Sequence, residues 1–275
     1  MAITAADVSK LRKSTGAGMM DCKKALVEAE GDFDKAVEII RKKGQAIANK
    51  RADREATEGV VLAGVSADAK RGAMITLNCE TDFVAKNESF VAFVQSILDL
   101  AIANDPADLD ALKALELNGR PVSEVITEQI GVIGEKLDLA YFEKVSAETV
   151  AAYVHPGNKL ATLVGFNQAG FDPQVSKDVA MQAAAMAPVA LDADSVPADV
   201  REKELEIGKE MARNEGKPEA MLEKIAMGRL NKFFKENTLV NQMFVKDNKI
   251  TIKQYLDNSS KGLEAIAFKR FTLNS

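Results

Sequence analysis

This sequence of 275 residues contains no tryptophan, one histidine and two cysteines. A structural zinc site needs about four cysteine or histidine ligands, usually in closely spaced pairs. Cys22, Cys79 and His155 supply three at most, and none of them lies near another along the chain. We therefore expect no metal site of this kind.

The same scarcity leaves little material for catalysis. A cysteine and a histidine can form a nucleophilic pair, but Cys22 and Cys79 both lie among apolar neighbours, which favours small buried hydrophobes. The sequence also lacks the glycine-rich loop that binds nucleoside triphosphates. Without a convincing nucleophile, base and orienting group, we expect neither an enzyme nor a bound cofactor.

Long apolar runs are absent as well. No stretch reaches the ~18 apolar residues that a membrane span needs, and the N-terminal residues lack the apolar core of a signal peptide. Two unpaired thiols are also typical of a reducing compartment. These features predict a cytoplasmic protein that does not contact a membrane.

Charge is present in both signs, since 36 Lys and Arg residues accompany 41 Asp and Glu residues for a net charge of −5. This balance argues against one large nucleic-acid-binding face and favours a protein or small-molecule partner. The distribution is uneven, because residues 1–55 carry a net +3 and the remaining chain −8. The length allows roughly two globular domains.

The first 55 residues have the pattern of three short helices. Thr4 with Asp7 resembles a capping box, the glycines of residues 15–18 favour a turn, and Asp32 can cap a third helix that we expect to end at Gly44. The helices form a minimal helical module over residues 1–55. Its basic tail has two open interpretations, a solvated linker helix or a binding surface, and contains Arg41, Lys42, Lys43, Lys50, Arg51 and Arg54.

From Gly59 the pattern becomes extended. Val60–Val65 and Ala73–Cys79 predict a hairpin, followed by a helix over Glu88–Ala103. The same order returns 86 residues later, with Thr76-Leu77 and Thr162-Leu163 in equivalent places. The sequence thus predicts two related α+β core subdomains, over residues 56–145 and over 146–189 with 232–275. The remaining predicted elements are strands over 149–155, 160–166, 139–145 and 266–273 and helices over 109–115, 123–136 and 176–187.

Charged helical sequence follows Pro197. Val200, Glu204, Ile207 and Met211 step by four, three and four, and residues 216–218 turn the chain into a second helix. We expect a helical hairpin inserted over residues 190–231. Such a hairpin either packs on its own core or forms a contact between copies of the chain.

The segment Asn78–Asn87 directly follows a predicted strand and is the most unusual in the sequence. Thr81 can cap a short helical turn that begins at Asp82. Phe83 then has two possible roles: it packs into the core, or it is presented beside a carboxylate as the aromatic anchor of an interface.

Two long motifs resemble a known family. Residues 11–26 (LRKSTGAGMMDCKKAL) and 80–86 (ETDFVAK) are similar to those of translation elongation factor Ts. Shorter features at 133–135, 216–218, 228–233 and 242–245 continue the likeness, which spans nearly the whole chain. The family architecture is α+β, with a ubiquitin-associated-like three-helix module, two related core subdomains and an inserted helical hairpin.

The resemblance implies a guanine-nucleotide exchange factor that binds elongation factor Tu, dislodges magnesium and promotes release of GDP. It implies that Phe83 is a wedge, that Asp82 displaces hydrogen bonds in the partner, and that Thr81 and Val84 hold the turn. Weaker partner contacts are implied for Leu11, Met19, Met20 and His155. Because the hairpin dimerises some members, a homodimer is a further implied option, and direct nucleic-acid binding is not expected.

Two features depart from the family. Many members carry a histidine where this chain has Gln182, so a contact made by that histidine is not expected here. Many also continue into a C-terminal helical module, whereas this sequence ends at Ser275.

Two rival functions remain open alternatives. The first is an adaptor that binds ubiquitin-like modules or RNA through its basic tail, and the second is an enzyme that uses a cysteine with His155. Neither accounts for residues 81–84.

Overall fold

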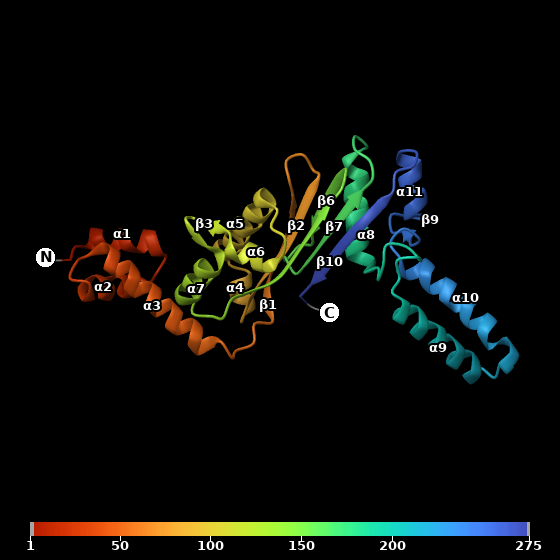
Figure 1. The fold of residues 1–275 in the computed structure, drawn as a ribbon, viewed down its shortest axis with the longest axis horizontal. Helices are drawn as coiled ribbons and strands as arrows, with labels where there is room; N and C mark the ends of the chain where they lie inside the picture. Colours follow the sequence, from red (N-terminus) through yellow and green to blue (C-terminus); the bar gives the residue numbers. More distant parts are fainter. Residues whose placement is uncertain (1–2, 274–275) are drawn as a thin grey trace.

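The computed structural model describes residues 3–273 and shows an elongated molecule (Figure 1). A three-helix unit lies at one end, two sheets with their helices lie in the middle, and a helical hairpin lies at the other end. Among residues 3–273, no helix has the length and hydropathy needed to cross a membrane.

The N-terminal unit contains α1 (Ala5–Thr15), α2 (Met19–Glu28) and α3 (Phe33–Arg51). The predicted capping box at Thr4 and the cap at Asp32 are both confirmed. The three helices enclose a small core of their own, formed by Val8, Leu11, Ala17, Cys22, Ala25, Leu26, Ala29 and Ala36.

The prediction that α3 ends at Gly44 was wrong, because the helix continues to Arg51. Gly44 is buried where α3 crosses α7 (Val122–Ile133). A Cβ atom on Gly131 of α7 would lie 2.6 Å from Cα of Gly44. These two glycines therefore allow a close helix crossing, and in this place glycine does not mark a helix end.

Two three-stranded antiparallel sheets form the centre. The first has the order β1-β2-β5, with β1 (Glu58–Val65), β2 (Arg71–Cys79) and β5 (Asp138–Ser146). The second has the order β10-β7-β6, with β6 (Thr149–Val154), β7 (Leu160–Phe166) and β10 (Ala265–Thr272). Both predicted hairpins are confirmed, and Thr76 and Thr162 are both buried on a central strand.

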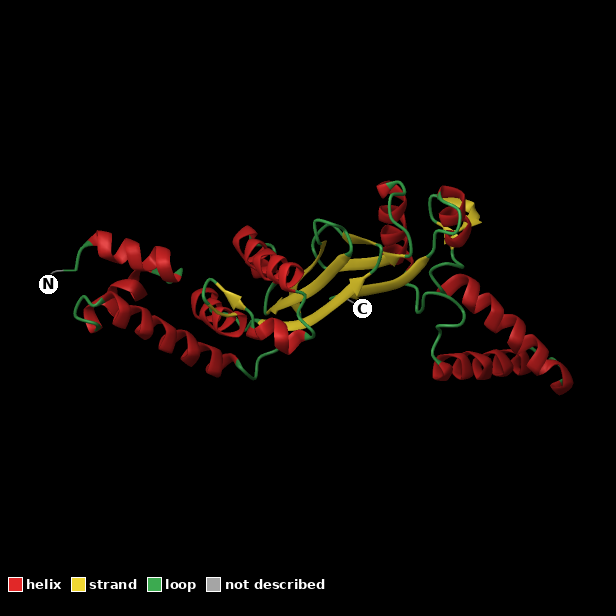
Figure 2. Ribbon diagram, turned by 45° about the horizontal axis from the view of Figure 1, so that its top comes forward, coloured by secondary structure: helices red, strands yellow, loops and turns green. Residues whose placement is uncertain are grey.

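The alternation of side chains along each strand separates the two faces of each sheet. Ile75 and Leu77 of β2 pack among helices, whereas Met74 packs against Leu163 of the second sheet. Val164 of β7 packs among helices on the opposite side. The centre is thus layered helix, sheet, sheet, helix, with the strands together in the middle (Figure 2).

The helices and short strands on the first sheet's side are α4 (Asp82–Ala85), α5 (Glu88–Asn104), α6 (Leu109–Ala114), β3 (Glu116–Leu117), β4 (Arg120–Pro121) and α7. Those near the second sheet are α8 (Pro173–Met186), β8 (Met243–Phe244), β9 (Asp247–Thr251) and α11 (Ile252–Ser259). Helix α8 begins three residues before its predicted start at Ser176, because Asp172 caps it and Pro173 occupies its first turn.

The predicted hairpin consists of α9 (Ala198–Asn214) and α10 (Glu219–Asn237). Its predicted seam was wrong by one position, because Ile207 and Met211 are exposed and Gly208 and Ala212 are buried. A Cβ atom on Gly208 would lie 3.1 Å from Cα of Ala226. Small residues of α9 therefore bring the helices together, and Ile207 and Met211 are left outside.

We expect Gly131→Ala to lower the free energy of unfolding by about 1–3 kcal/mol, because the added methyl group meets the α3 backbone. Gly228→Ala in α10 is the matched control, since nothing lies within 4 Å of a Cβ atom there. That control should be neutral or stabilising by up to about 1 kcal/mol. Urea denaturation followed by circular dichroism measures both, and equal stability of the two variants would contradict the close crossing.

Candidate functional site

The segment singled out in the sequence forms a single exposed helical turn at the end of β2. Thr81 is the N-cap of α4, and its Oγ1 accepts a hydrogen bond from the backbone N–H of Val84 at 3.5 Å. The predicted cap is confirmed.

Phe83 is the most exposed large apolar side chain in the described residues, with 83% of its surface accessible. Val84 is half-buried and packs on the helix-covered face of the first sheet, and Ala85 is buried. The turn therefore anchors itself through Val84 and Ala85 while its phenylalanine points outward. Of the two interpretations left open by the sequence, the structure supports the exposed one.

Asp82 lies next to Phe83 with its carboxylate toward solvent. Nζ of Lys86 donates to Oδ2 of Asp82 at 2.6 Å, one helical turn away. This hydrogen bond and the charge of Lys86 hold the pKa of Asp82 below its ordinary value. The turn thus presents an aromatic ring and an ionised carboxylate side by side.

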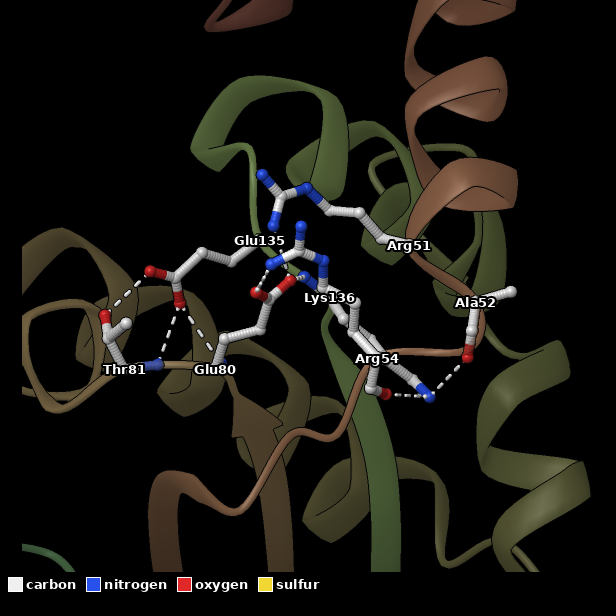
Figure 3. Close-up of polar contacts among 7 residues, drawn as sticks. All are labelled: Arg51, Ala52, Arg54, Glu80, Thr81, Glu135 and Lys136. Carbon is white, nitrogen blue, oxygen red and sulfur yellow. Dashed lines mark hydrogen bonds and ion pairs between the residues drawn. The ribbon is translucent and has the colours of Figure 1, made fainter.

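Glu135 holds the start of the turn (Figure 3). Its Oε2 accepts the backbone N–H groups of Glu80 at 3.1 Å and Thr81 at 3.0 Å, and its Oε1 accepts the hydroxyl of Thr81 at 2.7 Å. Glu135 follows α7 directly, and Gly134 caps that helix with a left-handed backbone at φ 78°. A positive φ favours glycine, which lets the chain turn and bring Glu135 to the turn.

Glu80 connects the turn to the end of α3. Its Oε1 accepts from Nη1 of Arg51 at 2.7 Å and from the backbone N–H of Lys136 at 2.6 Å, and Arg54 lies 3.5 Å from Oε2. Burial opposes ionisation of Glu80, but these hydrogen bonds and charges outweigh it and lower the pKa of the carboxyl. Lys136 in turn donates through Nζ to the carbonyl oxygens of Ala52 and Arg54.

Four of the six basic side chains of the tail form ion pairs with other elements of the chain, a use that neither interpretation from the sequence included. Arg51 and Arg54 pair with Glu80, Arg41 pairs with Glu128 of α7 at 3.0 Å, and Lys43 pairs with Asp21 of α2. The three arginines therefore dock α3 and the segment after it on the body of the protein, whereas Lys43 joins α3 to α2 within the three-helix unit. This shared use of the arginines is the feature that sequence reasoning missed.

The other candidate residues on the three-helix unit differ in exposure. Met19 and Met20 lie on the surface of α2, 57% and 62% exposed, and together with Val8 and Ile3 line an apolar groove. Leu11 is fully buried in the core of the three-helix unit. A direct partner contact by Leu11 was therefore a wrong expectation, because its side chain packs inward between the helices.

His155 lies at the exposed turn after β6, where Nδ1 is 3.0 Å from the hydroxyl of Tyr153. The same turn meets α4 across a groove of roughly 490 Å³ that Asp82, Lys86, His155 and Lys159 help to line. The fold thus brings the Phe83 turn and the β6–β7 turn together, although more than 70 residues separate them. No local sequence pattern predicted this proximity.

Neither cysteine is placed for catalysis. Cys22 and Cys79 are both fully buried, as their apolar neighbours predicted. Burial, with a smaller contribution from the charge of Glu135, raises the pKa of the Cys79 thiol to about 12. Across residues 3–273, no three His, Cys, Asp or Glu side chains are grouped so that they could hold a metal ion.

Gln182 stands where a family histidine was expected, and it is fully buried. Its Nε2 donates to Oε1 of Gln242 and to the carbonyl oxygen of Met243, and its Oε1 accepts the N–H of Val245 at 2.9 Å. The amide therefore joins α8 to the segment after the hairpin and makes its hydrogen bonds within the chain.

Comparisons with known proteins agree in one family. A family model described as "Elongation factor TS" matches residues 80–275, beginning at the first residue of the ETDFVAK motif. The chain is 59% identical to the elongation factor Ts of Amoebophilus asiaticus, with 98% of each chain covered. It is 53% identical to that of Porphyromonas gingivalis, with all of both chains covered, and 52% identical to that of Azobacteroides pseudotrichonymphae, with 100% and 99% covered.

The buried thiols generate a prediction about reactivity. In the native protein at about pH 8, neither Cys22 nor Cys79 should react with Ellman's reagent within minutes, because a thiolate must be exposed to attack. In denaturant both of the chain's two cysteines should react. A fast-reacting thiol in the native protein would contradict the assignment and reopen the cysteine enzyme as a candidate.

Proposed function

Because this chain belongs to the elongation factor Ts family, with its role in translation elongation, we propose that it is a guanine-nucleotide exchange factor for elongation factor Tu. It acts in the cytoplasm as a protein-binding factor and not as an enzyme. It binds the complex of elongation factor Tu with GDP, dislodges magnesium and promotes exchange of GDP for GTP. The observation that carries the proposal is the outward-pointing Phe83 beside the ionised Asp82 on a braced turn.

The chemistry of the partner explains why such a turn suffices. A GTPase holds GDP through its phosphate loop and through a magnesium ion that contacts the β-phosphate. Loss of the ion removes a large local positive charge, so the diphosphate is held less tightly. By linkage, a factor that weakens nucleotide binding is itself bound more weakly while nucleotide is present.

Each residue of the turn has a role in this proposal. Phe83 enters between elements of the partner's nucleotide-binding domain, and Asp82 competes for hydrogen bonds there. Thr81 and Val84 hold the turn, the first as its cap and the second through the core. One buried aromatic anchor contributes about 2–4 kcal/mol at an interface, and each 1.4 kcal/mol of coupling weakens nucleotide binding about tenfold.

Two further surfaces are proposed as partner contacts. Met19 and Met20 offer exposed apolar area on the three-helix unit, for which Leu11 supplies only the supporting core. His155 and the groove beside α4 extend the contact from the Phe83 turn to the second sheet. The rival adaptor function is disfavoured, because Arg41, Arg51 and Arg54 are engaged with carboxylates of the chain itself.

We also propose the domain division that the family implies. It consists of a ubiquitin-associated-like module over 1–55, core subdomains over 56–145 and over 146–189 with 232–275, and a hairpin insert over 190–231. Three separate hydrophobic clusters support it, one in the three-helix unit and one on the outer face of each sheet. Helix α10 continues past 231 to Asn237, which makes the last boundary the least sharp.

Phe83→Ala should slow GDP release from elongation factor Tu by about tenfold or more, because the exposed ring is lost without disturbing the core. Stopped-flow release of labelled GDP across magnesium concentrations measures the effect. Val65→Ala is the matched control, since Val65 is exposed at the opposite end of the same strand pair. Equal rates for Phe83→Ala and the native protein at matched thermal stability would refute the wedge.

The exposed face of the hairpin supports a homodimer as a second proposal. Ile207 and Met211 lie one helical turn apart and outside the seam of the hairpin. Replacing both by lysine should convert a dimer into a monomer in sedimentation velocity, because like charges would meet where apolar surface is buried. Met243→Lys, at an exposed methionine outside the hairpin, should leave the mass unchanged. A native protein that is monomeric across a concentration series would remove this proposal.

A further inference from the structure

We propose that Glu80 and Glu135 are positioning residues that fix the Phe83 turn to the ends of α3 and α7. Through them, the placement of the three-helix unit sets the orientation of Phe83. This inference deepens the proposed exchange function, and its kinetic consequence rests on that function. Its structural consequence is testable on the protein alone.

The Phe83 turn needs support from outside its own residues. Helix α4 has only four residues, far too few for a helix that is stable by itself. Its own cap is weak, because the N–H of Val84 reaches Oγ1 of Thr81 only at 3.5 Å. The carboxylate of Glu135 supplies what is missing by accepting two backbone N–H groups and the Thr81 hydroxyl. A charged acceptor makes these hydrogen bonds stronger than neutral ones.

The segments around Glu80 and Glu135 support each other. The N–H of Glu80 donates to Glu135, while the N–H of the next residue, Lys136, donates to the carboxylate of Glu80. Two short segments, 80–81 and 135–136, are thus joined side by side by their backbones and their carboxylates (Figure 3). A shift of either segment breaks hydrogen bonds at both, so the end of α7 and the start of the turn move together.

The two joined segments are also connected to the end of α3. Arg51, the last residue of α3, and Arg54 bind Glu80, and Lys136 binds the carbonyl oxygens of Ala52 and Arg54. The side chain of Glu80 is only 12% exposed, so its charge depends on these partners. Removing one partner leaves the charge of Glu80 less well compensated, which weakens the connection between α3 and the turn.

Helix α3 connects the three-helix unit to Glu80 as one stiff element. The helix runs without interruption from Phe33 in the three-helix unit to Arg51, a length of about 28 Å. The Gly44–Gly131 crossing and the Arg41–Glu128 pair fix it against α7 on the way. A tilt of the three-helix unit would therefore displace Arg51, and with it Glu80 and the turn. A turn held in one geometry before binding loses less conformational entropy when the partner is bound.

The test in the free protein is amide hydrogen exchange at Thr81 and Val84, followed by NMR. Glu135→Ala should speed exchange at both amides by about tenfold. Glu135→Gln should stay within about threefold of the native rate, because its amide oxygen accepts the two N–H groups and its nitrogen donates to Thr81. Arg51→Ala should speed exchange at the same amides, although it lies in another helix.

Arg213→Ala is the matched control, because it removes an arginine–carboxylate pair from the exposed hairpin. It should leave the two amides unchanged. Unchanged protection at Thr81 and Val84 in both Glu135→Ala and Arg51→Ala would overturn the proposal. If Glu135→Ala does not fold, Arg51→Ala with its control decides the question.

The second arm separates positioning from general damage. In GDP release from elongation factor Tu, Glu135→Ala should lower the maximal rate by about tenfold, which corresponds to about 1.4 kcal/mol. The half-saturating concentration should change by less than about threefold, since the remaining surface is intact. Glu135→Gln should restore the maximal rate. Altered amide exchange with an unaltered maximal rate would overturn the role in exchange.

The two hypotheses fail in different ways. If Phe83→Ala has no effect on GDP release, the wedge is wrong, and the amide measurement still decides whether the carboxylates fix the turn. Phe83→Ala could slow GDP release while Arg51→Ala and Glu135→Ala match the native protein in both amide exchange and GDP release. In that case the exchange function stands and the positioning role is wrong.

Discussion

The carboxylate of Glu135 accepts three hydrogen bonds from the two residues that precede the Phe83 turn, and the rest of the site depends on this constraint. A four-residue helical turn is too short to be stable by itself, and its aromatic ring, 83% exposed, adds little support. The carboxylate of Glu135, together with that of Glu80, which pairs with Arg51 at the end of α3, supplies that support with strong, directional bonds. The site is therefore rigid in its base and exposed at its tip.

In the proposed function, this arrangement lets a chain poor in catalytic residues act on a nucleotide that its partner holds. The two thiols are buried, and the pKa of Cys79 is raised to about 12. In the proposed function the reactive centre belongs to the partner, and the free energy comes from burial of Phe83 and from hydrogen bonds made by Asp82. The layered core of two sheets supplies a stiff platform for that contact.

Local chemistry made much of the fold predictable. Thr4, Asp32 and Thr81 cap helices because their side-chain oxygens reach backbone N–H groups a few residues on, which spacing alone reveals. Alternating apolar residues located the strands of both hairpins. Prediction failed where a glycine had a packing partner far along the chain: Gly44 packs against Gly131 and does not end α3, and Gly208 packs against Ala226 within the hairpin. The hairpin seam was mispredicted for the same reason, since small residues of α9 are buried between the two helices while Ile207 and Met211 are exposed.

The sequence by itself determined the classes of element, the family through its two long motifs, and the residues of the exposed turn. It could not determine whether Phe83 points inward or outward, because a phenylalanine in a capped turn is compatible with both. Only the tertiary structure decided this, by packing Val84 and Ala85 into the core and leaving Phe83 outside. It also decided that residues 51, 80 and 135 meet. Hydrogen bonds between segments so far apart depend on how α3, β2 and α7 pack, and no local pattern encodes that.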